Sequence, residues 1–423
     1  MVLMHGLMEK NECCRGLVQR LVMAATAGVG VIQLSLSLLV VMFFLRDSIV
    51  VEGKNTPAVK SFETEYGDIY DCIDIYKQPA FDHPALKNHT IQMEPTSYPQ
   101  GMSKESSSTT EVLDLGLPDG GCPKGTVPIR RIRKADVMIG KPPKRHFANA
   151  TLNGPKPMLY QPPGRSHAIA RTLPGEYYGT EVYMNVWNPK VDHGVDMFSL
   201  AQTWITAGSG YEVNTIEVGW LVSYSRNHDV ITKMFVYWTT DGYRSTGCYN
   251  TDCPGYVQLN ERIPVDYRLD HHTSTYNGQQ YDVKINLFKD TRSGHWYLFR
   301  DLLPIGYWPS DVFDKLDTKA DLVTWGGEVY YDVDICRRLT GSIYCPYPEM
   351  GSGHFPAEGY GKAAYMKELQ VIDNKNMQYN PAKDCELIND RPDCFRITQN
   401  QKGVQVLPAN HILFGGPGGY CRW

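Results

Sequence analysis

Two segments far apart in the chain alternate apolar and polar residues with the period of a half-buried strand. In Asn214–Tyr224 (NTIEVGWLVSY) one face is apolar and Glu217 lies on the other, and in Val323–Val333 (VTWGGEVYYDV) Glu328 repeats this arrangement. We therefore expect each glutamate to point away from the most apolar face of its strand. The apolar faces consist of Ile216, Val218, Trp220 and Val222 in the first segment and of Trp325, Val329, Tyr331 and Val333 in the second.

A glycine lies two residues from each glutamate and on the same face, Gly219 in the first segment and Gly326 in the second. A glycine inside a strand often marks the close approach of another backbone or of a ligand. Two carboxyl groups on strand faces without bulky neighbours would suit an extended substrate. The alternative is that each glutamate is an ordinary solvent-facing residue and each glycine a bulge.

The rest of the chain after His167 predicts strands and turns, with hairpin-type turns at Asp241-Gly242 and Ser293-Gly294. The segment Ser310–Leu316 favours one short helix with Ser310 as its cap. Many strands and little helix predict an all-β fold, an antiparallel β-sandwich that forms a single domain. The expected strands are Thr180–Trp187, Phe198–Ile205, Val213–Tyr224, Val230–Thr239, Tyr281–Phe288, Trp296–Arg300, Leu322–Val333 and Ala363–Ile372.

Composition narrows the class of protein. The 423 residues include 38 Gly, 27 Pro and 27 Tyr, which is typical of a turn-rich, aromatic-rich globular protein. The formal net charge of −4 provides no basic field, so no nucleic-acid partner is expected.

Changes in composition divide the chain into four segments. Residues 1–46 contain an apolar run, residues 47–148 form a small module, residues 149–166 form a linker, and residues 167–423 form the β-sandwich. The linker is placed in a stretch rich in Pro, Gly, Lys and Asn, a composition that disfavours regular structure. An exposed linker of this kind is where a protease would cut.

The apolar run Leu21–Leu45 has no charged residue and is long enough to span a bilayer. We expect an uncleaved signal anchor or, if Met23 is the true start, a signal peptide. Both send the rest of the chain into the secretory pathway, as a secreted or vacuolar protein or as a type II membrane protein with a lumenal catalytic domain. Glycosylation sequons at Asn88 and Asn149 agree with that compartment.

Motifs for nucleophilic or metal catalysis are absent from the sequence. There is no GxSxG or HExxH, and the adjacent His271 and His272 would face opposite ways on a strand. We therefore expect no metal and no cofactor. Carboxyl groups remain as candidate catalytic groups. An ionised carboxylate can activate water, while a protonated carboxyl donates its proton to an oxyanion or to a leaving amine. The same chemistry can hydrolyse a glycosidic bond, so it does not by itself separate peptide from sugar.

Several long blocks stand out in the sequence: YDCIDIYKQPAFDHPALKNHTIQ, CPKGTVPIRR, SLAQTWI, NTIEVGW, VYWTTDGYRSTGCYN, WGGEV, MGSGHFPAEGYGKAAYMKELQVID and FGGPG. From about Ser61 to the end, the chain with these blocks resembles the neprosin family of plants. The resemblance implies a propeptide domain followed by a β-sandwich glutamic peptidase that is active in acid and cleaves after proline. Carried over by motif, its two catalytic glutamates are Glu217 in NTIEVGW and Glu328 in WGGEV.

The cysteines favour disulfides over zinc, because none of their close spacings is CxxC. Of the 11 cysteines, Cys13 and Cys14 precede the apolar run, which leaves an odd number, nine, after it. The resemblance implies the pairs Cys72–Cys122 and Cys248–Cys253. We also expect Cys336–Cys345, which flank LTGSIY, and Cys394–Cys421, which leaves Cys385 over.

We interpret the chain as the zymogen of a glutamic endopeptidase that acts on proline-containing peptides. Glu217 and Glu328 would share a proton and activate water between them, and the propeptide would cover the cleft as an inhibitor. A position of the two glutamates on opposite sides of the sandwich, or a permanent arginine or lysine partner on either buried carboxyl, would overturn the peptidase assignment. The alternatives are a glycosidase or non-catalytic cell-wall carbohydrate-binding protein on the same sandwich, and an inactive relative held at a membrane. The residues expected to shape a pocket for a proline ring are Gln202, Trp204, Tyr237 and Trp325.

Overall fold

Antiparallel β-sheet makes up most of the computed structural model, which describes residues 57–65, 67–102, 116–131, 164–193, 196–381, 385–400 and 407–421. These residues belong to one compact unit, Thr56–Trp423. The apolar run Leu21–Leu45 and most of the predicted linker lie outside the described residues. Within them, no helix is long and apolar enough to cross a membrane. The domain limits and the membrane segment therefore remain predictions.

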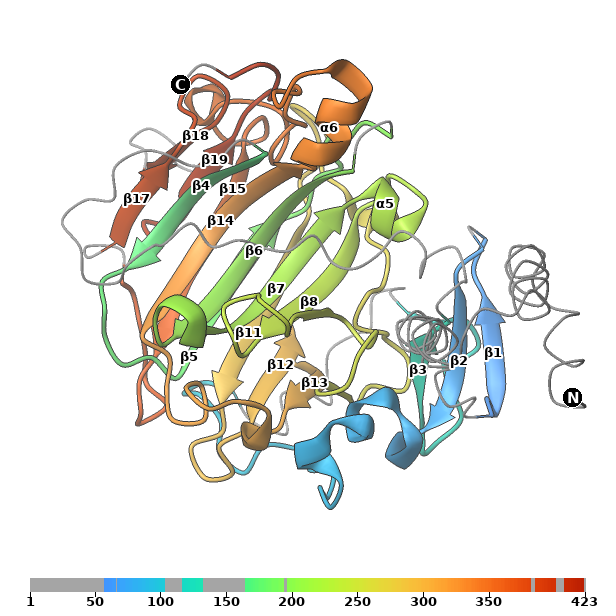
Figure 1. Cartoon of the computed structure of the whole chain (residues 1–423). Helices are drawn as coiled ribbons and strands as arrows, with labels where there is room; N and C mark the ends of the chain where they lie inside the picture. Colours follow the sequence, from blue (N-terminus) through green and yellow to red (C-terminus); the bar gives the residue numbers. More distant parts are fainter. Residues whose placement is uncertain are drawn as a thin grey trace, which may run out of the picture. The chain divides into compact units, whose positions relative to one another are not determined.

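Two large antiparallel sheets form the β-sandwich that the alternation predicts (Figure 1). The first has seven strands, in the spatial order β17 (Cys385–Asn389), β4 (Arg165–Thr172), β14 (Leu322–Tyr331), β6 (Met197–Ala207), β7 (Asn214–Val222), β8 (Lys233–Thr239) and β9 (Cys248–Tyr249). The second has nine, in the order β10 (Val257–Gln258), β13 (Leu303–Trp308), β12 (Trp296–Arg300), β11 (Asp282–Lys289), β5 (Gly179–Asn185), β15 (Ala364–Ile372), β19 (Ile412–Gly415) and β18 (Arg396–Gln399), with β16 (Gln378–Tyr379) paired to β15.

Helices in the described residues are short and lie in the connections between strands. Two are α-helical, α5 (Tyr224–Asn227) and α6 (Val333–Thr340). The 3-10 helices are η1 (Ile75–Lys77), η2 (Pro79–Asp82), η3 (Pro84–Leu86), η5 (Gly210–Glu212), η6 (Asp270–His272), η7 (Ser310–Val312) and η8 (Pro356–Glu358).

Large side chains fill the space between the two sheets. The indole of Trp220 on β7 donates a hydrogen bond of 2.9 Å to the carbonyl oxygen of Asn185, and that of Trp325 on β14 donates one of 3.0 Å to Oγ1 of Thr180. Both acceptors lie on β5 of the other sheet, so each indole spans the layers while its N–H is satisfied, as buried tryptophans require. The apolar face predicted for each glutamate-bearing strand is thus the sandwich core.

The opposite face of the seven-stranded sheet, called here the outer face, carries Glu217 and Glu328. Successive residues of a strand point to opposite sides, so residues at the glutamates' parity lie outside the core between the sheets. A second apolar cluster surrounds the two glutamates on this face, composed of Phe198, Leu200, Leu221, Phe235, Tyr237, Tyr243 and Tyr249, with Tyr330 packed against it.

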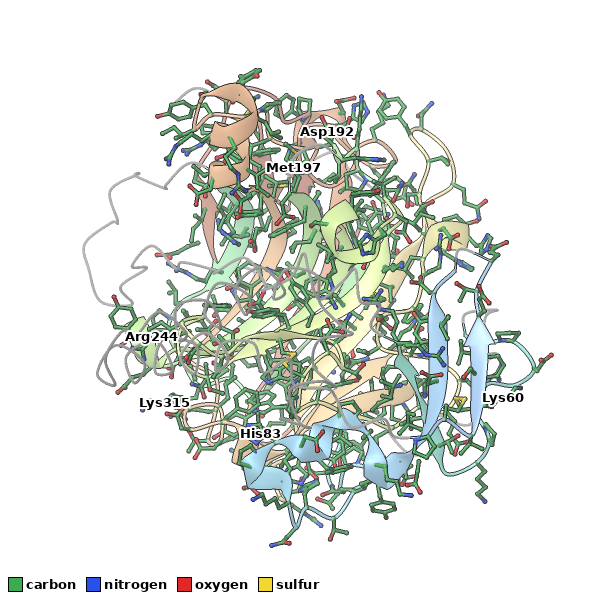
Figure 2. The ribbon with its side chains drawn as sticks, turned by 45° about the vertical axis from the view of Figure 1, so that its right-hand side comes forward. Lys60, His83, Asp192, Met197, Arg244 and Lys315 are labelled. Carbon is green, nitrogen blue, oxygen red and sulfur yellow. A yellow bond between two sulfur atoms is a disulfide. The ribbon has the colours of Figure 1, made fainter. Side chains whose placement is uncertain are left out.

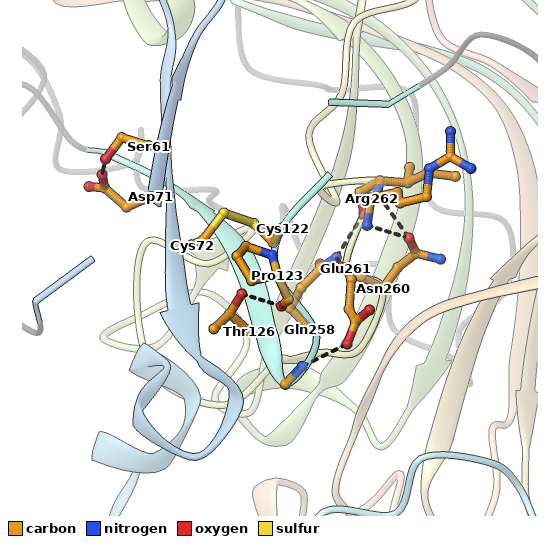
Figure 3. The surroundings of a disulfide bond; sticks show 12 residues. Ser61, Asp71, Cys72, Cys122, Pro123, Thr126, Gln258, Asn260, Glu261 and Arg262 are labelled. Carbon is orange, nitrogen blue, oxygen red and sulfur yellow. Dashed lines mark hydrogen bonds between the residues drawn. A yellow bond between two sulfur atoms is a disulfide. The ribbon is translucent and has the colours of Figure 1, made fainter. Parts of the chain in front are cut away.

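An N-terminal module, residues 57–102 and 116–131, contacts the edge of the sandwich. It contains a three-stranded sheet of β1 (Lys60–Glu63), β2 (Ile69–Asp74) and β3 (Thr126–Arg130), and the disulfide Cys72–Cys122 (Figure 3). Next to that disulfide, the backbone N–H of Cys122 donates to the carbonyl oxygen of Glu261 at 2.8 Å. The module therefore continues the hydrogen bonding of the sandwich.

Buried charges also join the module to the sandwich. Lys233 of β8 places Nζ 2.6 Å from Asp68 Oδ2 of the module, and Arg130 of β3 places Nε 3.1 Å from Asp266 Oδ2. All four side chains are at most 6% exposed. Charges so far from water are tolerated because each has an oppositely charged partner.

A second attachment centres on Asp290, in the turn after β11. Its carboxylate accepts hydrogen bonds from the backbone N–H of Thr96 at 2.8 Å and from the hydroxyl of Ser97 at 2.7 Å. Burial raises the pKa of Asp290, but the hydrogen bonds from Thr96, Ser97 and Ser293 outweigh it and hold that pKa below its ordinary value. The ionised form of Asp290 thus binds the module.

The structure corrects three expectations about secondary structure. Strand β4 begins at Arg165, inside the predicted linker, because its backbone pairs with β14 on one side and β17 on the other. The expected helix from Ser310 is a single 3-10 turn without a side-chain cap, since Asn214 Oδ1 accepts the backbone N–H groups of Asp314 and Lys315. Val333 starts α6 and does not end β14, because Asp332 caps that helix by accepting from Ile335 N–H at 2.7 Å.

The neighbouring arginines of the module provide a test of the buried ion pairs. Replacing Arg130 by Gln leaves Asp266 buried without its charged partner, so we expect a loss of about 3–5 kcal/mol in the free energy of unfolding. The control is Arg131→Gln, because the Arg131 side chain is 50% exposed beside Asp71 and such a pair contributes at most about 1 kcal/mol. Urea unfolding of the full chain measures both. Equal effects of the two changes would contradict the assignment.

Candidate active site

Strand register places Glu217 and Glu328 on one face, separated by β6. On β6, Trp204 lies opposite Glu217 of β7, and Leu200 lies opposite Glu328 of β14. Gln202 lies between these positions on the same face. Both glutamates are buried, with exposed fractions of 1% and 2%.

Gln202 is bonded to one of the two glutamates. Its Nε2 donates to Glu328 Oε2 at 3.1 Å, while its Oε1 is buried without a hydrogen-bond partner in the described part of the chain. An unpaired buried amide oxygen is costly, so it marks a place where a donor from a substrate, from water or from a protonated acid would fit.

The two glycines predicted to mark close approach lie beside Gln202 in the register, Gly219 on β7 and Gly326 on β14. A Cβ at Gly219 would collide with the carbonyl oxygen of Ala201 on β6, and one at Gly326 with that of Ala168 on β4. The close neighbour in each case is therefore an adjacent strand. These glycines let the strands that carry the glutamates pack tightly.

Hydroxyl groups bind Glu217. The hydroxyl of Tyr243 donates to Glu217 Oε1 at 2.6 Å, and Thr215 Oγ1 lies 3.2 Å from the same oxygen. Tyr243 has a positive φ of 64° in the loop after β8, next to the exposed Arg244 (Figure 2). The sequence predicted a turn at Asp241-Gly242 but gave no sign that the tyrosine after it reaches the site.

Charged groups from β4 surround Glu328. The guanidinium Nη1 of Arg165 is in ion-pair contact with Glu328 Oε1, and Nε2 of His167 lies 3.7 Å from Glu328 Oε2. The Arg165 guanidinium lies 5.1 Å from the ring centre of Tyr330 and 5.7 Å from that of Phe198. Two aromatic faces therefore hold the guanidinium next to the carboxyl.

The Arg165 contact changes the mechanism expected from the sequence. A permanent arginine partner on either glutamate was expected to overturn the peptidase assignment, and Arg165 meets that condition. The condition was too broad, because an arginine beside a carboxyl favours its charged form and leaves the carboxylate in place. What the contact excludes is a proton shared between equivalent carboxyls, which requires similar surroundings at both. Because Glu328 has such a partner, we drop the shared-proton form. Two carboxyls with different partners remain on one face, an arrangement in which each can hold a different protonation state.

The predicted pocket residues divide between the two faces of the sheet. Gln202, Trp204 and Tyr237 lie on the outer face with the glutamates, and Tyr237 lies opposite Glu217 in the register. The prediction for Trp325 is wrong, because its side chain lies in the sandwich core, bonded to Thr180. Residues 325 and 328 differ in parity, so they point to opposite sides of β14.

Sequence reasoning missed Arg165 and His167 because it missed β4. The inward residues of this strand, Ser166, Ala168 and Ala170, are small, so the alternation there is weak. The signal that was missed is the alternation of the polar residues Arg165 and His167 with the small residues Ser166 and Ala168.

The remaining predicted residues lie away from the glutamates' immediate partners. Asn88 is exposed and Asn149 lies outside the described residues. Besides Cys72–Cys122, the structure contains the disulfides Cys248–Cys253, Cys336–Cys345 and Cys394–Cys421, and Cys385 takes part in none of the four.

One group of potential metal ligands is found among the described residues. Glu65, Asp270 and His271 place ligand atoms within 4.8 Å of one another. Glu65 and His271 are exposed, and acidic surface groups of this kind are common without a metal. We assign no metal to them.

Two family profiles match the chain. The profile described as neprosin matches residues 195–417, and that described as the neprosin activation peptide matches residues 61–171. The first match contains both glutamates, and the second contains most of the N-terminal module together with Arg165 and His167.

Solved structures are similar to the chain at a low level. A scytalido-glutamic peptidase with a peptide-based transition state analog has 8% identity and a TM-score of 0.29, over 60% of this chain and 98% of that one. The β-porphyranase BpGH16B from the human gut bacterium Bacteroides plebeius has 6% identity and a TM-score of 0.20, over 37% and 61%. A native glycosidic hydrolase has 12% identity and a TM-score of 0.16, over 38% and 76%. Scores this low carry no argument about function.

The tight packing at Gly219 is testable. In Gly219→Ala the added methyl meets the backbone of β6, which cannot move without disturbing the register, so we expect a loss of about 1–3 kcal/mol in the free energy of unfolding. The control is Gly278→Ala, where the methyl meets the side chain of Thr275 in an exposed turn. Urea midpoints of the two variants give the comparison. A fully stable Gly219→Ala protein would show that β6 and β7 are not so closely packed.

Proposed function

The chain belongs to the neprosin family, and from this premise we propose that Glu217 and Glu328 hydrolyse peptide bonds after proline at acidic pH. Its family and its activation peptide make the protein a peptidase zymogen whose activity the activation peptide regulates. The observation that carries the proposal is the position of both glutamates on one buried face, with Gln202 between them in the strand register.

The geometry supports hydrolysis by acid and base together. An ionised carboxylate takes a proton from water as the water attacks the scissile carbonyl, and a protonated carboxyl donates to the developing oxyanion or the leaving amine. This requires one carboxyl in each state at the same time. An acidic working range follows, because a carboxylic acid loses its proton as the pH approaches neutrality.

Aromatic side chains beside Glu217 suit the compact apolar ring of proline. Tyr237 lies opposite Glu217, and its ring centre is 4.7 Å from that of Tyr249 and 5.9 Å from that of Tyr243. Closely spaced rings form an apolar surface of the kind that docks proline residues in other recognition sites. We assign these three tyrosines to the proline-binding part of the cleft.

The zymogen is expected to be activated by cleavage in the predicted linker, in the part of it that precedes β4, residues 149–163. In the full chain the two glutamates are almost inaccessible, and we propose that cleavage opens the outer face to substrate. The four disulfides suit an oxidising compartment, which supports a place in the secretory pathway.

Replacing either glutamate by Gln is the direct test of this function. Glu217→Gln and Glu328→Gln keep the shape of the side chain but remove its acid–base chemistry, so we expect kcat/KM of the processed protein to fall by about 10²–10⁴-fold. The matched control is Glu386→Gln, an exposed residue of β17 paired with Arg171. Wild-type activity in either active-site variant would contradict the proposal.

Substrate choice separates the peptidase from the carbohydrate-active alternative. We expect the processed protein to cut a peptide with an internal proline on the carboxyl side of that residue, faster in acid than at neutral pH. The same peptide with alanine in place of proline should be cut more slowly. Mass spectrometry of the products gives the cleavage position, and plant polysaccharides are incubated in parallel. Release of sugars without peptide cleavage would favour the glycosidase.

A further inference from the structure

Glu328 lies at the end of a chain of buried polar groups. The imidazole of His167 lies between two carboxyls, with Nδ1 3.2 Å from Asp390 Oδ2 and Nε2 3.7 Å from Glu328 Oε2. The backbone N–H of His167 donates to Asp390 Oδ1 at 2.9 Å, and the hydroxyl of Ser166 donates to the same oxygen. Asp390 therefore orients both the ring and the backbone of His167.

Asp390 is held as a carboxylate in this arrangement. Burial raises the pKa of Asp390, but the hydrogen bonds and charge of His167 and the hydroxyl of Ser166 outweigh it and bring that pKa below its ordinary value. The ionised Asp390 orients the imidazole of His167, so that Nε2 of the ring faces Glu328.

We propose that Arg165 and His167, with Asp390 behind the imidazole, hold Glu328 as the ionised carboxylate of the pair. This inference rests on the proposed peptidase function and assigns different roles to its two glutamates. Glu328 is then the base that activates water, and Glu217 is the acid. Arg165, His167 and Asp390 are positioning residues, since they act through Glu328 and need not touch the substrate.

The surroundings of Glu217 fit the neutral role. The hydroxyls of Tyr243 and Thr215 accept hydrogen bonds as readily as they donate them, so they can bind a protonated carboxyl. A negative charge at Glu328 raises the cost of a second negative charge on the same buried face. A carboxyl beside hydroxyls, opposite one beside a guanidinium, therefore suits the role of the acid.

The reaction balances with these roles. Water attacks the scissile carbonyl carbon and gives one proton to Glu328, while Glu217 gives its proton to the leaving nitrogen as the C–N bond breaks. The products are an acid and an amine. Glu328 then releases its proton and Glu217 takes one up, which restores the starting state without any oxidant or co-reactant.

Several other titratable or charged groups lie near Glu217 and Glu328 and contribute to the pH dependence of this site. The titratable and charged groups around Glu328 are Arg165 and His167 on β4, Tyr330 on β14, Asp332 beyond that tyrosine, and Asp390 and Arg391 after β17. Those around Glu217 are Tyr237 and Tyr243.

The pH dependence of kcat in the processed protein tests the assignment. The base must be ionised, so activity falls on the acid side as Glu328 takes up a proton. Removing the positive charge in Arg165→Gln makes that uptake occur at higher pH, and we expect the acid limb to move upward by about one to three pH units. Arg165→Lys keeps the charge and should restore most of the wild-type profile.

Arg171→Gln is the matched control, because it removes an arginine of the same strand that pairs with Glu386 away from the glutamates. Its acid limb should stay in place. An unmoved acid limb in Arg165→Gln, or a loss of rate that is equal at every pH, would overturn the inference. So would a failure of Arg165→Lys to restore the profile.

His167→Gln keeps the test decisive if Arg165→Gln does not fold, as judged by circular dichroism. It should move the acid limb upward by a smaller amount, and an unmoved limb would overturn the inference. The two levels of the hypothesis fail in different ways. If Glu217→Gln and Glu328→Gln are inactive but the acid limb stays in place in Arg165→Gln and His167→Gln, only the assignment of roles is rejected. If Glu217→Gln or Glu328→Gln is active, the peptidase mechanism itself is rejected.

Discussion

The pairing of β6 with β7 on one side and β14 on the other is the constraint on which the site depends. Backbone hydrogen bonds set the register of these three strands, and the register decides which side chains share a face. A slip of one residue in β7 or β14 would move a glutamate into the sandwich core. The glycines beside Gln202 protect the register, because a larger residue there would press on the backbone of the next strand.

Unlike partners give the two carboxyls different properties. Glu328 lies against a guanidinium and an imidazole, and Glu217 lies against hydroxyls. Two identical side chains in identical surroundings would compete for one proton, whereas different surroundings allow the two carboxyls different roles. Tyr330 and Phe198 hold the guanidinium in place, so the aromatic cluster of the outer face contributes to the electrostatics as well as to packing.

The N-terminal module is attached to the sandwich by contacts that are stable together and are lost together. Its contacts with the sandwich are buried ion pairs and hydrogen bonds around Asp68, Arg130 and Asp290, together with backbone bonds near Cys122. Buried polar contacts are stable while every partner is present, and they fail together once one is lost. An interface of this kind suits an activation peptide that regulates the activity of the peptidase.

Local alternation in the sequence determined much of the fold. A strand's period of two is visible in the sequence of that strand alone, so the alternation identified β6, β7 and β14 and placed both glutamates opposite the core. It also determined that Trp325 faces away from Glu328, although that tryptophan was assigned to the pocket. The two hydrogen bonds that limit Ser310–Val312 to a single turn are accepted by the distant Asn214, and no local pattern could show them.

The tertiary structure alone decided what surrounds each glutamate. Arg165 and His167 reach Glu328 because β4 pairs with β14, Asp390 reaches His167 because β17 pairs with β4, and Tyr243 reaches Glu217 through a loop after β8. The contact between His167 and Asp390 joins residues 223 positions apart in the chain. Strand neighbours and loop paths are set by the packing of the whole chain, and the sequence of one strand carries no record of which strand will lie beside it.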